Sequence, residues 1–133
     1  MARPTAITLL AFLGITALAG AVPLILHPAG SVLMPLSLLQ HSPFHSFLIP
    51  GVILLVANGL LSLAVLGLVV AQSPNHALWV MFQGSVLLGW LVIECWMLRT
   101  VIWLHWFYAV VALALIVVGL TLRRSMGRKS EMP

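Results

Sequence analysis

Four long apolar runs dominate this sequence of 133 residues and limit the folds open to it. They cover residues 5–26, 49–71, 78–98 and 101–122. A run of about 20 apolar residues is long enough to cross the hydrocarbon core of a bilayer as a helix. Backbone groups in lipid must be hydrogen-bonded within the protein, and the alternating pattern of a membrane β-barrel is missing. The sequence therefore predicts an all-α integral membrane protein with four spans.

The composition agrees with a chain that is surrounded by lipid. Hydrophobic residues make up 62% of the sequence and charged residues 6%, whereas soluble domains carry roughly 25% charged residues. So little charge cannot cover a water-facing globule, so we expect one transmembrane domain with the lipid bilayer as its main partner. The net charge of +4 comes mostly from a short tail after the last run, and it does not indicate a nucleic-acid partner.

Short connections decide how the four spans are arranged. The second and third runs are joined by the turn-rich segment QSPNHA, and the third and fourth by Arg99-Thr100. Neighbouring helices joined this tightly must be antiparallel, which predicts an up-down-up-down four-helix bundle. Small and polar residues suited to helix packing in lipid recur at helical spacing. They are Thr16 and Gly20, Ala17 and Ala21, and the series Gly51, Leu55, Asn58 and Ser62, which shares one helix face.

The segment at 27–48, between the first and second spans, is long, apolar and rich in proline. We expect it to lie at the membrane interface, either as a lid over the bundle or as a loop that binds or gates a ligand. Ser42-Pro43 resembles an N-cap followed by a proline at the first helical position. It predicts a short helix that runs into the second span, with a kink at Pro50-Gly51.

The same segment carries a resemblance to known sequences. HPAGSVLMPLSLLQHSPFHSFLIPG, followed by an apolar span with Asn58-Gly59, resembles a group of small, uncharacterised bacterial four-span membrane proteins. That group shares an MPLSLLxHSPFxxFLIPG-type element between spans one and two. The resemblance covers about a fifth of the chain, and the other spans match in length and hydropathy. It implies a bacterial inner membrane and a four-span architecture, and it implies no catalytic residue.

The basic residues predict the orientation in the membrane. Arg123, Arg124, Arg128 and Lys129 lie in the tail at 123–133, and Arg3 precedes the first span. Basic residues next to spans are retained in the cytoplasm, so both termini are expected there. Arg99 on the opposite side is outnumbered. We expect the tail to be disordered and to attract anionic lipid.

Glu94 is the only acidic residue inside an apolar run, since the other, Glu131, lies near the C-terminus. A charged side chain in the hydrocarbon region is costly and usually faces the interior of the bundle, paired or hydrated. On a helical wheel, Gln83, Leu87, Trp90, Glu94 and Met97 fall on one face. The pattern predicts an inward stripe with Glu94 close to the outer surface.

The short hairpin between the last two spans brings further polar groups toward Glu94. His105 is expected at a similar depth, Tyr108 one turn deeper as a hydrogen-bond donor, and Asn58 from the second span at a slightly deeper level. The candidate ligand- or proton-binding residues are thus Glu94, His105, Gln83, Trp90, Asn58 and Tyr108.

Three roles remain open for this constellation. Glu94 can be a structural acid, neutral or paired with His105 or Arg99, that fixes the helix register. It can belong to a proton-coupled or cation-binding pocket open to the outside. The third role is a metal or haem site with the loop histidines His27, His41 and His45, together with His105, Cys95 and Glu94.

Enzymatic chemistry is disfavoured by what the sequence lacks. There is no aspartate, so no Ser-His-Asp triad can form, and the pair of carboxylates used in two-carboxyl hydrolysis is missing. We expect a non-enzymatic accessory, assembly or homo-oligomeric membrane protein without a cofactor. The alternative is a minimal proton-coupled transporter or ion-conducting protein that uses Glu94.

Overall fold

The structure is a computed structural model that describes residues 2–29, 46–98 and 103–131. At residue 98 and at residues 126–131 it describes the backbone only. Its elements in chain order are α1 (Ala2–Leu26), α2 (Leu48–Leu54), η2 (Leu55–Leu60), α3 (Leu61–Val70), α4 (His76–Leu98) and α5 (Trp103–Glu131). The π-helix η2 joins α2 to α3, so these three elements form one span. All elements in the described ranges are helical, which confirms the predicted all-α fold.

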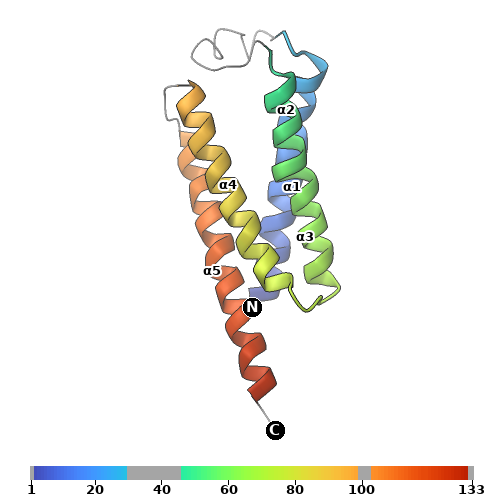
Figure 1. Ribbon diagram of the computed structural model, residues 1–133, viewed down its shortest axis with the longest axis vertical. Coiled ribbons are helices and arrows are strands. Elements are labelled where there is room, and N and C mark those ends of the chain that lie inside the picture. The colour runs from blue at the N-terminus through green and yellow to red at the C-terminus, as the bar shows by residue number, and fades with distance from the viewer. Residues whose placement is uncertain (1, 30–45, 99–102, 132–133) are drawn as a thin grey trace.

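The four spans form an antiparallel bundle made of two hairpins (Figure 1). The helix α1 packs along α2, η2 and α3, while α4 and α5 make the most extensive pair. Contacts of α1 with α5, and of α4 with α3 and η2, join the two hairpins. The N-terminus lies at the end of the bundle that carries the α3–α4 turn, and α5 continues beyond that end (Figure 1). The up-down-up-down order is therefore confirmed.

All four helices are long and apolar enough to cross a membrane. The candidate spans are Ala2–Leu26, Leu48–Val70, His76–Met97 and Trp103–Ser125, each within three residues of the predicted start. Within an apolar stretch of 18 residues in each span, between 28% and 33% is buried inside the bundle, so most of each span faces outward. Lipid is as apolar as leucine, and an outward-facing apolar surface is what a bilayer requires.

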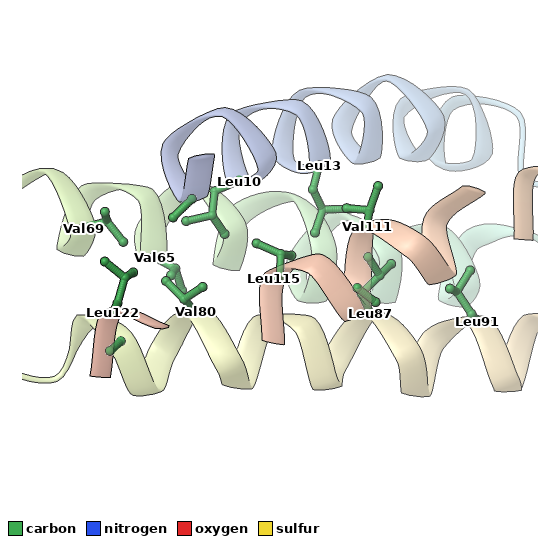
Figure 2. Packing of buried hydrophobic residues seen from close by; sticks show 13 residues of the cluster. Leu10, Leu13, Val65, Val69, Val80, Leu87, Leu91, Val111, Leu115 and Leu122 are labelled. Atoms are coloured by element: carbon green, nitrogen blue, oxygen red, sulfur yellow. The ribbon is translucent and has the colours of Figure 1, made fainter. Parts of the chain in front are cut away.

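A large buried cluster connects the helices along the bundle axis (Figure 2). Leu10, Val65, Val80 and Leu115 are fully buried in it and come from α1, α3, α4 and α5. Within a bilayer these side chains leave lipid rather than water, so close packing, not water exclusion, stabilises the contact.

Two glycines allow α4 and α5 to approach each other closely. A Cβ atom at Gly84 would lie 2.7 Å from the Ala112 carbonyl oxygen and 2.8 Å from Ile116 Cγ1. One at Gly119 would lie 3.1 Å from the Ala77 carbonyl oxygen. Small residues at helix crossings bring backbones together in membranes, and here they fix the tightest helix pair of the fold.

The turn after α3 closes with a Schellman motif. Ser73 N–H donates to the Leu68 carbonyl (3.0 Å) and Gln72 N–H donates to the Val69 carbonyl (3.1 Å). Gln72 takes the left-handed conformation, with φ 53°, in which glycine is the usual residue. Arg3 of α1 donates to the Val70 carbonyl at 2.9 Å, so a cation satisfies the exposed end of α3.

Helix α2 begins at Leu48, one residue before the predicted start of the second span. The short helix predicted to begin at Ser42-Pro43 has its predicted start outside the described residues. Pro50 sits in the first turn of α2, where its missing N–H has no helical partner to lose. About one turn after Pro50 the span changes from α-helix to the π-helix η2.

The basic tail was predicted to be disordered, and this is wrong for its backbone up to Glu131. Helix α5 runs from Trp103 to Glu131 and projects past the α3–α4 turn (Figure 1). Arginine, lysine and methionine are good helix formers, and no proline lies between Trp103 and Pro133. Basic residues near a helix C-terminus also interact favourably with the helix dipole.

Candidate functional site

Glu94 of α4 and His105 of α5 face each other near the end of the bundle opposite the chain termini. Glu94 Oε2 lies 3.7 Å from His105 Nε2, a distance too long for a good hydrogen bond but within ion-pair range when the imidazole is protonated. The His105 side chain is 6% exposed and the Glu94 side chain 35% exposed. The pair therefore joins a buried base to an acid that is still reachable from outside the bundle.

The predicted inward stripe of α4 is seen in the burial of its side chains. Gln83 is fully buried, and Leu87, Trp90 and Met97 are at most 9% exposed. Glu94 lies three residues before Met97, or about 4.5 Å along the axis from the end of the candidate span. Glu94 is thus the one partly exposed side chain in this otherwise buried stripe, and it lies near one end of the span.

Asn58 does not approach Glu94, contrary to the sequence-based expectation. It lies instead beside Gln83, with Asn58 Oδ1 3.5 Å from Gln83 Nε2. Gln83 and Glu94 are separated by about 16 Å along α4, at 1.5 Å per residue. The structure therefore divides the predicted constellation into an outer pair, Glu94 and His105, and a deeper cluster that contains Asn58 and Gln83.

The deeper cluster is built around the π-helix η2, which sequence reasoning did not find. The Leu61 N–H donates to the Val56 carbonyl, five residues back, instead of to Ala57. Gln83 Nε2 from α4 donates to the Ala57 carbonyl at 3.1 Å. An interhelical side-chain bond thus reaches the Ala57 carbonyl, which the Leu61 N–H does not bond. The buried Gln83 was the available sequence signal, because a buried amide in a span needs partners.

Tyr108 is oriented toward α1 and not toward the Glu94 carboxyl group. Its ring centroid lies 6.2 Å from that of Phe12 and 5.4 Å from that of Phe107. Its role in the described part of the structure is aromatic packing between α5 and α1.

The structure offers little to the metal or haem hypothesis. His27 lies exposed just after α1, and His41 and His45 fall outside the described residues. Among the residues that are described, no group of three His, Cys, Asp or Glu side chains could hold a metal ion. Cys95, next to Glu94 in the sequence, is a free, half-buried thiol.

The fold and the outer pair define a class: a small, four-span, all-α membrane protein with an acid–imidazole pair near one end of the bundle. In comparisons with known proteins, no family model, curated protein or solved structure matches this chain.

Proposed function

We propose that this chain is a non-enzymatic accessory or assembly protein of the bacterial inner membrane. It works by lateral association through the lipid-facing side of α4, which carries Ser85 and Gly89. In this function the bundle serves as a scaffold against which a second copy of the chain packs. We infer localisation in the bacterial inner membrane from the resemblance of the segment between spans one and two to that of small bacterial four-span membrane proteins. We infer cytoplasmic termini from the basic residues near both ends of the sequence.

The observation that carries this proposal is an open pair of small residues on α4. Ser85 and Gly89 are four residues apart and exposed, and a Cβ atom added at Gly89 would meet nothing within 4 Å. By contrast, the space beside Gly84 on the inward face is occupied by Ala112 and Ile116 of α5. Small residues spaced by four allow two membrane helices to cross at short distance. Small residues that allow a close helix crossing, as Gly84 does toward α5, are thus also present on the lipid-facing side of α4, where no helix of the described structure covers them.

Cysteine crosslinking in native membranes tests this proposal. In a Cys95→Ser background, Ser85→Cys should form a disulfide-linked dimer on mild oxidation, because a symmetric crossing at Ser85 brings the two Cα atoms within bonding range, about 4.4–6.8 Å. Gly67→Cys is the matched control, since Gly67 of α3 is also exposed with nothing within 4 Å. The proposal requires dimer to predominate for Ser85→Cys only. Equal crosslinking of both variants, or none, would refute it.

A second function is favoured by the Glu94–His105 pair. Two ionisable side chains 3.7 Å apart, one of them partly exposed, suit the uptake of a proton or cation from the outer side. This supports a minimal proton-coupled transporter or ion-conducting protein as the alternative. Glu94→Gln removes the charge and keeps the shape of the side chain, so it separates this function from association.

A further inference from the structure

Three fully buried polar side chains near the middle of the bundle carry atoms without a hydrogen-bond partner. These atoms are Asn58 Nδ2, Ser62 Oγ and Gln83 Oε1. All three residues are 0% exposed. Buried polar groups are nearly always hydrogen-bonded, and a group left unpaired away from water is costly. Three such atoms on adjoining segments of the second span and α4 indicate a missing partner.

Rotating the side-chain amides does not remove the problem. Gln83 Nε2 donates to the Ala57 carbonyl, so turning this amide would set Oε1 against another acceptor. Asn58 Oδ1 faces Gln83 Nε2, so turning that amide would set one NH₂ group against another. The orientations present are therefore the best available to the protein alone.

Ser62 differs from four other hydroxyl side chains in the spans. Thr8, Thr16, Ser85 and Thr121 each donate to the carbonyl four residues back, at 2.8–3.0 Å. These four bonds involve exposed groups, whereas Ser62 is buried and its Oγ has no such bond. In a membrane helix the backbone carbonyl is the usual partner of a serine hydroxyl. The Ser62 hydroxyl is thus left without the partner that such a hydroxyl usually has.

We propose that Asn58, Ser62 and Gln83 bind an ordered water molecule near the middle of the membrane. The unpaired atoms include a donor (Asn58 Nδ2), an acceptor (Gln83 Oε1) and a hydroxyl that can do either. Water matches this mixed set, whereas a metal cation takes oxygen ligands and leaves the Asn58 NH₂ group unpaired. Buried waters typically make about three hydrogen bonds to groups of this kind. The water completes the polar layer that Gln83 begins by holding the Ala57 carbonyl of η2.

Solid-state NMR of the full chain in lipid bilayers, with ¹⁵N-labelled asparagine, tests this site. The sequence contains two asparagines, so the spectrum has two side-chain NH₂ signals, from buried Asn58 and exposed Asn75. Asn58 is expected to show a cross-peak to water, as the exposed Asn75 does. The absence of a water cross-peak at Asn58 would overturn the proposal.

The stability of Ser62→Ala gives an independent result whose sign distinguishes the two cases. With water bound, the variant loses a hydrogen bond, and the folded-to-unfolded ratio should fall about fivefold. In a dry site the substitution removes an unpaired polar group, so the ratio should stay level or rise, which would overturn the proposal. Thr121→Val is the matched control and should leave the ratio nearly unchanged, because the Thr121 hydroxyl is exposed and bonds its own helix.

Discussion

Gly84→Leu is expected to destabilise the bundle by about 3 kcal/mol, the upper end of the usual cost of overpacking. The first added carbon would lie 2.7 Å from the Ala112 carbonyl oxygen, which belongs to the backbone and cannot move without separating α4 from α5. The rest of the leucine side chain increases the clash with Ile116. Detergent-induced unfolding of the purified monomer, followed by circular dichroism, measures the effect.

Gly89→Leu is the control for this substitution. Gly89 is five residues further along α4 and a Cβ atom there meets nothing within 4 Å. Leucine is a better helix former than glycine, by most of the about 0.8–1 kcal/mol that separates alanine from glycine, so monomer stability should stay level or rise. Equal losses for Gly84→Leu and Gly89→Leu would show that the tight α4–α5 contact is wrong.

The second large effect is expected from removing the carboxyl group of Glu94. Glu94→Ala should destabilise the fold by about 2 kcal/mol, less than the ~3–5 kcal/mol for a fully buried pair because the Glu94 side chain is 35% exposed. The buried His105 would lose its polar neighbour on α4. Glu94→Gln, which preserves shape and hydrogen-bonding capacity, should cost about 0.5 kcal/mol. The same unfolding assay compares the two variants.

The two variants also decide between association and transport. If the pair serves structure alone, Glu94→Gln should leave proton leakage into protein-containing liposomes unchanged from that of the native chain. A proton flux that the native protein supports and Glu94→Gln abolishes, with folding intact, would establish the transport alternative. A stability loss for Glu94→Gln as large as for Glu94→Ala would contradict the structural role of the pair.

The sequence predicts much of the fold because the bilayer leaves few choices. Four apolar runs must become helices, and their short connections make neighbours antiparallel. The inward face of α4 was also predictable, since Gln83 and Glu94 share it and polar groups avoid lipid. The proximity of Glu94 and His105 follows from the hairpin geometry, although the function of the pair is still a prediction.

Other features depend on packing that one segment does not encode. The π-helix η2 lies where Gln83 of another span donates to the Ala57 carbonyl, so the sequence of 55–60 alone does not reveal it. Asn58 was assigned to Glu94 by approximate depth, but rotation and register of the second span bring it to Gln83. The contrast between Gly84 and Gly89 also requires the neighbouring helix, because both are glycines in one apolar run.

Association of two copies through the lipid-facing side of α4, which carries Ser85 and Gly89, can be measured by energy transfer between donor- and acceptor-labelled chains in liposomes, over a series of lipid dilutions. The native chain should associate, and Gly89→Leu should weaken association about tenfold, or ~1.4 kcal/mol, because the leucine side chain holds the two helices apart. No transfer above random proximity for the native chain, or equal association of Gly89→Leu, would show that this side of α4 does not bind a second copy.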